Sequence, residues 1–116
     1  MEDTVAGYLD VAALDDIKPG RAAGFSVDGH EVLVCREGDG EKVHAFHNRC
    51  THAGAPMNGA RCTPAGWFAC PLHGARFDLA TGASIGTPPY LPLTRYPSRI
   101  VDGRVQVAPS TGDTPA

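Results

Sequence analysis

Three Asp-Gly dipeptides constrain most strongly what this chain can fold into. Asp28-Gly29, Asp39-Gly40 and Asp102-Gly103 each separate two short, largely apolar runs. A two-residue hairpin turn of type I′ needs a positive φ at both central positions, which Asp tolerates and Gly adopts freely. The three dipeptides therefore predict three antiparallel hairpins.

The hydrophobic pattern between these turns has a period of two, as expected for strands. Val105 and Val107 alternate with polar residues, which suits a strand with one wet face, whereas residues 32–35 are apolar on both faces and suit a central strand. Only residues 11–17 are compatible with a helical turn, because Pro19-Gly20 would end it. The predicted strands are residues 23–27, 31–36, 42–47, 99–101 and 104–107. We therefore predict an all-β, antiparallel fold.

Composition narrows the class of protein further. Fourteen glycines and ten prolines indicate many tight turns, and ten basic against thirteen acidic residues give a net charge of −3. That charge has the wrong sign for binding nucleic acid. The opening MEDTVAGYLD lacks the basic and apolar segments of a signal peptide, and no apolar run is long enough to cross a bilayer. We expect a cytoplasmic protein that binds neither nucleic acid nor membrane.

The length of 116 residues leaves room for one hydrophobic core. We predict a single domain over residues 1–107. Residues 108–116, APSTGDTPA, are polar and proline-containing, which predicts a flexible C-terminal tail. Because no large exposed apolar patch is evident, a monomer is expected.

The chemistry of the chain is concentrated in two short motifs. Cys50-Thr51-His52 and Cys70-Pro71-Leu72-His73 combine into the pattern CxHx17CxxH. Each motif presents one thiol and one imidazole from a stretch followed by Gly54 or Gly74, as a tight loop would. A loop can direct both side chains at one centre, whereas a strand sends neighbours to opposite faces. The apolar Trp67-Phe68-Ala69 and the other residues between the motifs can run out and back as strands, so that the loops meet.

Two cysteines and two histidines suit zinc as well as iron. Zinc fingers usually pair two cysteines in one knuckle and two histidines on a helix. Here each motif mixes the two types, as a Rieske centre requires, because one iron takes both cysteines and the other takes both histidines. The mixed spacing favours the iron centre and leaves zinc as the alternative.

On these motifs the chain resembles the Rieske family, and in particular the soluble Rieske-type ferredoxins of bacterial ring-hydroxylating oxygenases. Gly86-Thr87-Pro88-Pro89 resembles the family's third loop, and the segment from Tyr96 to Val105 resembles its closing hairpin. The resemblance implies an antiparallel β-sandwich or barrel with a cluster-binding subdomain formed by two ligand loops. It implies one 2Fe-2S cluster. By the resemblance, Cys50 and Cys70 would bind the inner iron, and His52 and His73 would bind the outer iron.

The function implied by the resemblance is one-electron transfer rather than catalysis. The carrier would accept an electron from a flavin-dependent ferredoxin reductase and deliver it to a terminal oxygenase that hydroxylates an aromatic ring. Two alternatives stay open: a small redox subunit of a nitrite-reductase-like enzyme, and a zinc-stabilised interaction module without redox activity.

Other residues near the motifs are assigned by their context. Cys35 and Cys62 have no partner at a ligand spacing and are expected to be small core residues. His47 is expected to be a structural neighbour of the first motif rather than a proton relay. Arg49 and Arg76 flank the motifs. They are expected either to contact an acidic surface of a partner protein or simply to be exposed to solvent.

Four positions predict a low reduction potential. High-potential respiratory members of the family resemble C-T-H-x-G-C and C-P-C-H-G-S-x-Y, in which two further cysteines form a disulfide and two hydroxyls donate towards sulfur. In this chain Ala55 and Leu72 take the disulfide positions, and Ala75 and Phe77 replace the Ser and Tyr. The potential is therefore expected near the low end of the Rieske range, about −150 mV.

Overall fold

The computed structural model describes residues 7–38, 40, 42–50, 54, 56–71, 74–86 and 91–109. In this part of the chain strands and turns predominate, and the helical content is one short 3-10 helix, Leu14–Asp16. The strands are β1 (Leu9–Ala13), β2 (Ala22–Val27), β3 (His30–Glu37), β4 (Lys42–His47), β5 (Trp67–Ala69), β6 (Arg76–Asp78), β7 (Ser84–Ile85), β8 (Arg95–Tyr96), β9 (Ser98–Val101) and β10 (Arg104–Val107). The prediction of an all-β, antiparallel fold is confirmed.

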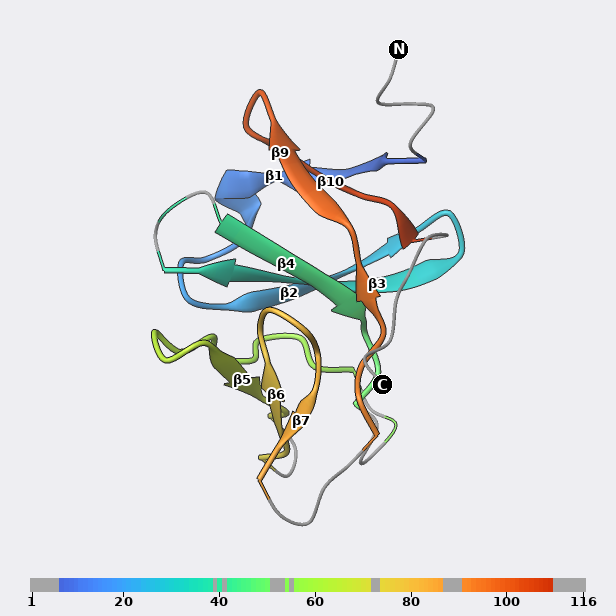
Figure 1. The fold of residues 1–116 in the computed structure, drawn as a ribbon. Coiled ribbons are helices and arrows are strands. Elements are labelled where there is room, and N and C mark those ends of the chain that lie inside the picture. Colours follow the sequence, from blue (N-terminus) through green and yellow to red (C-terminus); the bar gives the residue numbers. More distant parts are fainter. Residues whose placement is uncertain are drawn as a thin grey trace.

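The strands form three antiparallel sheets. Their orders are β1-β10-β9, β2-β3-β4-β8 and β5-β6-β7. In Figure 1 the sheet that contains β2, β3 and β4 lies between the other two, with β1, β9 and β10 on one side and the small β5-β6-β7 sheet on the other. The central sheet thus separates two halves of the molecule.

Two of the predicted hairpin turns have the backbone that their sequence requires. Asp28 and Gly29 have φ values of 49° and 80°, and Asp102 and Gly103 have values of 50° and 74°. Each pair joins adjacent antiparallel strands, β2 to β3 and β9 to β10. The β3–β4 hairpin is also present, although Asp39 lies outside the described residues.

Strand β3 supplies both halves of the molecule with core residues. Val32 and Val34 pack with Leu14, Ile17, Val105 and Val107 in one buried cluster, which we call the base core. Leu33 and Cys35 point to the opposite face, as the alternation of a strand requires, and belong to a second cluster, the loop core. All four residues from 32 to 35 are fully buried, which confirms the prediction of a central strand.

The predicted helical turn is shorter than expected. Residues 11–13 belong to β1, which pairs with β10 with an irregularity between Asp10 and Ala12, and only Leu14–Asp16 turns as a 3-10 helix. The amide of Leu14 donates to the carbonyl of Gly103 at 2.9 Å. Pairing with β10 satisfies backbone groups that a helix over residues 11–17 would have bonded internally, so the strand extends further than the pattern suggested.

Among the described residues no helix is long and apolar enough to span a membrane. At the other end of the chain, Ala108 is buried and its amide donates to the carbonyl of Pro97 at 3.0 Å. Residues 110–116, most of the predicted tail, lie outside the described part, and the domain boundary at residue 107 stays a prediction.

Candidate metal centre

Both cysteines of the two motifs are buried at the ends of strands. Cys50 follows β4 and is fully buried, and Cys70 directly follows β5 and is 1% exposed. Both are present as thiols rather than disulfides, and both lie in the loop core. A buried thiolate is costly unless something positive binds it, so two buried thiols in one core suit metal ligands.

Each of the two cysteines accepts a backbone hydrogen bond from the glycine four residues later in the chain. The amide of Gly54 donates to the carbonyl of Cys50 at 2.6 Å, and that of Gly74 donates to the carbonyl of Cys70 at 2.9 Å. Both glycines have a positive φ, 71° and 77°, which favours glycine over other residues. The two motifs thus start loops with matching backbone bonds, which fits a pair of equivalent ligand loops.

Asn48 holds the first loop closed. Its side-chain oxygen accepts the amide of Met57 at 2.7 Å, and its side-chain nitrogen donates to Oδ1 of Asn58 at 2.6 Å. Gly24 of β2 makes room for this contact, because a Cβ there would lie 2.1 Å from the Asn58 oxygen. The residues on either side of the loop that starts at Cys50 are therefore bonded directly to one another.

Sheet pairing and aromatic packing hold the second loop. Phe68 of β5 pairs with Phe77 of β6, and their ring centroids are 5.9 Å apart. The ring of Phe68 also lies 5.3 Å from that of Phe46 on β4. The Cys70 amide donates to the carbonyl of Ala75 at 2.7 Å, which closes the loop between β5 and β6. These contacts join the second loop to the central sheet.

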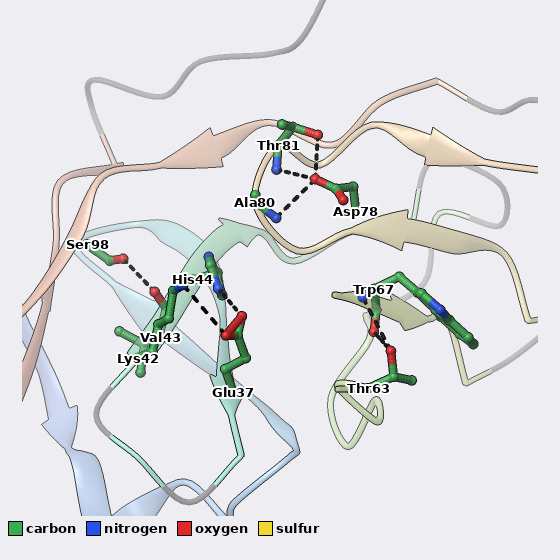
Figure 2. Close-up of polar contacts among 10 residues, drawn as sticks. All are labelled: Glu37, Lys42, Val43, His44, Thr63, Trp67, Asp78, Ala80, Thr81 and Ser98. Carbon is green, nitrogen blue, oxygen red and sulfur yellow. Dashed lines mark hydrogen bonds and ion pairs between the residues drawn. The ribbon is translucent and has the colours of Figure 1, made fainter. Parts of the chain in front are cut away.

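Turns at the other end of the small sheet are held by side chains. Figure 2 shows Oδ2 of Asp78 accepting the amides of Ala80 and Thr81 and the hydroxyl of Thr81, at distances of 2.9 to 3.1 Å. The Thr63 hydroxyl donates to the carbonyl of Trp67 at 2.9 Å. Local bonds of this kind fix the short strands that carry the second loop.

Two of the four predicted ligands can be placed. Cys50 and Cys70 lie in one core as expected, whereas His52 and His73 lie outside the described residues, as do Thr87, Pro88 and Pro89 of the predicted third loop. Within the described residues no group of three or more His, Cys, Asp or Glu side chains could hold a metal ion. The four-ligand set therefore stays a prediction.

The segment between the two loops is less regular than predicted. Residues 67–69 form β5, but residues 61 and 62 make only isolated bridges, to Arg21 and to Phe68. Pro56, Gly59, Pro64 and Gly66 interrupt this stretch. Proline cannot donate a hydrogen bond to a β-ladder, and glycine has no side chain to pack there. The described residues between the first motif and β5 are therefore irregular rather than a regular strand.

Two of the residues predicted to be neighbours of the motifs, His47 and Arg49, lie beside the first loop. His47 forms a 3.3 Å contact from Nδ1 to the hydroxyl of Tyr96, whose pKa is raised by burial. A hollow of about 210 Å³ is lined by Glu31, His47, Asn48, Arg49, Gly54 and Pro56. On the second loop, the exposed Arg76 lies over the ring of Trp67 at 5.3 Å.

Cys35 and Cys62 are both buried in the loop core, as predicted for small core residues. All four cysteines of the chain therefore share one core. Burial raises the pKa of the Cys35 thiol, and the neighbouring Cys35 thiol lowers the pKa of Cys62. Sequence spacing did not indicate that these two cysteines are neighbours.

Asn48 was also missed by the sequence analysis. The available signal was a carboxamide between an apolar strand and a Cys-x-His motif, where a buried polar side chain must find partners.

Comparison with known proteins adds three kinds of finding. The model of the Rieske [2Fe-2S] domain family matches residues 7–97. The ferredoxin component of the naphthalene 1,2-dioxygenase and salicylate 5-hydroxylase systems of Ralstonia sp. is 37% identical over 100 residues, covering 86% of this chain and 93% of the relative.

Solved structures show the same fold. The ferredoxin of carbazole 1,9a-dioxygenase from Nocardioides aromaticivorans IC177 matches with a TM-score of 0.76 and 39% identity, covering 87% of this chain and 96% of that one. A chain in a complex of reduced oxygenase and oxidized ferredoxin in carbazole 1,9a-dioxygenase matches with a TM-score of 0.75 and 29% identity, covering 89% and 94%.

A nitrite reductase subunit is similar as well. The putative NADH-dependent nitrite reductase small subunit from Mycobacterium tuberculosis matches with a TM-score of 0.75 and 28% identity, covering 94% of this chain and 96% of that one. The fold is thus shared between ferredoxins and this class of subunit, and the higher identities are to ferredoxins.

Proposed function

The chain belongs to the Rieske [2Fe-2S] domain family, and on that premise we propose that it is a one-electron carrier between a flavoprotein reductase and a terminal, aromatic-ring-hydroxylating oxygenase. The observation that carries the proposal is the pair of buried thiols, Cys50 and Cys70, at the starts of two matching loops. The ferredoxin components among its relatives support the same role.

We assign the cluster to four residues. Cys50 and Cys70 would hold the inner iron through sulfur, and His52 and His73 would hold the outer iron through ring nitrogens, as the resemblance of the two motifs implies. When bound, such a cluster takes up and releases one electron, and this reversible step is what a carrier needs. The buried positions of both cysteines support this assignment, and the two histidines are assigned from the motif alone.

Two buried positions after the second motif carry no hydroxyl group. Ala75 is 5% exposed and Phe77 is fully buried, and neither carries a hydroxyl that could donate to sulfur. Hydrogen bonds to the sulfurs raise the potential by stabilising the more negative reduced state. Their absence from these two positions supports a low-potential carrier that is reduced by a flavin.

The partners follow from the same proposal. A reductase supplies the electron and an oxygenase receives it, and the solved oxygenase–ferredoxin complex of carbazole 1,9a-dioxygenase gives a precedent for such docking. We further propose that the carrier acts as a monomer in the cytoplasm. Its four cysteines are all thiols, as is typical of a reducing compartment.

Metal content tests the ligand assignment. We expect about two irons and two acid-labile sulfides per chain in aerobically purified protein, which should be red-brown. His73→Cys should alter or abolish the visible spectrum, because a thiolate replaces a neutral imidazole. Cys62→Ser, outside the predicted ligand set, is the matched control and should keep the spectrum. Stoichiometric zinc without sulfide would instead support the zinc-stabilised module.

Reconstitution tests the role. The purified protein is added to candidate reductase and oxygenase pairs, with NADH and with NADPH, and product formation is measured. We expect turnover to depend on the added protein. Restoration of nitrite reduction in place of hydroxylation would support the nitrite-reductase alternative, to which the Mycobacterium tuberculosis subunit is similar.

A further inference from the structure

Three arginines lie in one row across neighbouring segments of the fold. Arg21, just before β2, lies opposite Arg61 in an antiparallel bridge, and Arg76 of β6 lies opposite Ala69 of β5. The segment of Arg61 borders β5 through a second antiparallel bridge one residue further on, which brings Arg61 beside Ala69. The order across the row is therefore Arg21, Arg61, Ala69 and Arg76. We call the three arginines the arginine strip.

The strip faces solvent because its neighbours in the chain face inwards. Successive side chains of an extended segment point to opposite faces. The residues that alternate with the row are buried in the loop core: Ala22, Ala60, Cys62, Phe68 and Phe77. Accordingly, all three arginines are exposed, and Ala69 between two of them is small and partly buried. Because neighbouring strands lie about 4.8 Å apart, the side chains of Arg61 and Arg76 start about 10 Å from each other.

The positive charge of the strip is not neutralised within the described part of the chain. None of the three arginines forms an ion pair with a described carboxylate, and Arg21 donates to a neutral acceptor, the carbonyl of Gly59, at 3.3 Å. Asp78 lies on the same face of β6, but its Oδ2 accepts three hydrogen bonds in the turn after that strand (Figure 2). Like charges directly opposite one another destabilise a sheet. The pair of Arg21 and Arg61 is therefore unfavourable unless an anionic group lies against it.

Arg76 is held in place by an aromatic ring and a close stretch of backbone. Its guanidinium carbon lies 5.3 Å from the centroid of the Trp67 ring. It also passes Gly86, where a Cβ would lie 2.8 Å from Nη2 of Arg76, so the missing side chain leaves room for the guanidinium. A guanidinium fixed in this way loses less freedom when it binds a carboxylate. Tryptophan and arginine are also enriched among the residues that dominate binding at protein interfaces.

The strip borders the second predicted ligand loop. Ala69 directly precedes Cys70, and Arg76 directly follows Ala75, whose carbonyl accepts the Cys70 amide where the loop closes. A protein bound to the strip would therefore lie beside the proposed cluster, as electron transfer requires. The whole chain has a net charge of −3, so this local positive charge favours an acidic partner and fixes the orientation in which the carrier meets it.

We propose that the arginine strip is the docking surface for the flavoprotein reductase, which presents carboxylates to it. This inference rests on the proposed function, because it takes the chain to be an electron carrier. The choice of the reductase over the oxygenase follows from charge. A carrier that has taken up an electron is one unit more negative, which weakens its attraction to an acidic protein. An acidic electron donor is therefore released after transfer, whereas an acidic acceptor would bind the oxidised carrier better than the reduced one.

The test measures binding of the oxidised, cluster-loaded protein to the purified reductase that supports turnover in reconstitution, by calorimetry. We expect Arg61→Gln and Arg76→Gln each to weaken binding severalfold at low salt, and the double variant to weaken it about tenfold. These differences should disappear in about 1 M salt, where the Debye length is about 3 Å. The matched control is Arg95→Gln, an exposed arginine on β8, which forms the edge of the central sheet opposite to β2. It should bind like the wild type, and the visible spectrum of each variant checks that the cluster is retained.

The same variants separate the two partners. Reduced wild-type protein should bind the reductase more weakly than oxidised protein, and electron transfer from the chemically reduced variants to the oxygenase should be unchanged. An equal loss in Arg95→Gln, a loss that persists at high salt, or an equal or larger loss of transfer to the oxygenase would each overturn the proposal. Wild-type binding and reduction of both strip variants would refute the strip alone. If the wild type accepts no electron from any reductase, the proposed function has failed, and this inference fails with it.

Discussion

On one face of β3, Val32 and Val34 pack in a base core of aliphatic side chains and one tyrosine, whereas on the other face Leu33 and Cys35 share the loop core with three phenylalanines and all the cysteines. The backbone differs in the same way. Strands β2, β3 and β4 have six, eight and six residues, but β5, β6 and β7 have only three, three and two. We call the β1-β10-β9 and β2-β3-β4-β8 sheets the base, and residues 56–71 and 74–86 with the β5-β6-β7 sheet the loop region. Because the base has the longer ladders, we expect the loop region to depend more on its core and on the proposed metal.

Removing the metal should give the largest difference between the two regions. Chelation of iron under reducing conditions should lower the melting temperature, because a group that binds only the native state contributes to folding. Hydrogen exchange should show lost protection in residues 56–86, with β2 to β4 still protected. An unchanged melting temperature would show instead that the loop region is self-sufficient.

Truncating Phe68 should be the next largest effect. Its ring is fully buried between Phe46 and Phe77, so Phe68→Ala should lower the free energy of unfolding by about 3 to 5 kcal/mol. The matched control is Ile17→Ala in the base core, with a loss of about 2 to 5 kcal/mol. Iron release in native buffer should be faster only in Phe68→Ala. Equal rates in both variants would mean that the two cores are not independent.

Loss of the Asn48 side chain should have a moderate effect. Asn48→Ala leaves the buried amide of Met57 without its acceptor, which should cost about 1 to 3 kcal/mol in denaturant unfolding. Asn58→Ala removes the partner on the exposed side of the same contact and should cost less, since water can replace it. Similar losses would show that Asn48 does not close the loop through Met57.

Added hydroxyls should change the potential more than the stability. Ala75→Ser and Phe77→Tyr should each raise the reduction potential from the expected value near −150 mV, provided that the hydroxyl reaches a donor geometry. Protein-film voltammetry at neutral pH measures this. A wild-type value above about +100 mV would contradict both the argument from missing hydroxyls and the proposed role. Because Phe77 is fully buried, Phe77→Tyr carries the greater risk of overpacking.

The smallest effect is expected at the exposed edge of the base. Hydrogen bonding from Arg104 lowers the pKa of Asp10, and the Arg104 Nε lies 3.1 Å from the carboxylate. A lowered folded-state pKa means that the carboxylate adds stability above its unfolded pKa and loses it as pH falls through the folded value. Asp10→Asn should therefore lower the melting temperature slightly at neutral pH, and the difference should vanish well below about pH 4. A difference that persists there would point to packing rather than charge.

Sequence patterns predicted the base better than the loop region. The turns Asp28-Gly29 and Asp102-Gly103 and the alternation of Val105 and Val107 identified its strands, because two-residue turns and period-two burial are local properties. The motif cysteines could be named from spacing. The hydrogen bond of Asn48 with Met57 and the burial of Cys35 and Cys62 in one core could not, because each joins positions that only the folded chain brings together.

The two-sided burial of β3 has a consequence for how the chain avoids misfolding. A slip of one position in strand pairing would exchange the faces, placing Cys35 among the valines of the base and Val34 among the aromatic rings of the loop core. Both cores would be mismatched at once, so the error would be penalised twice. The two-residue turn at Asp28 and Gly29 fixes the β2–β3 register locally, without a contact to either core. The alignment set at this turn thus also decides where β3 places the residues that pack beside the proposed ligand loops.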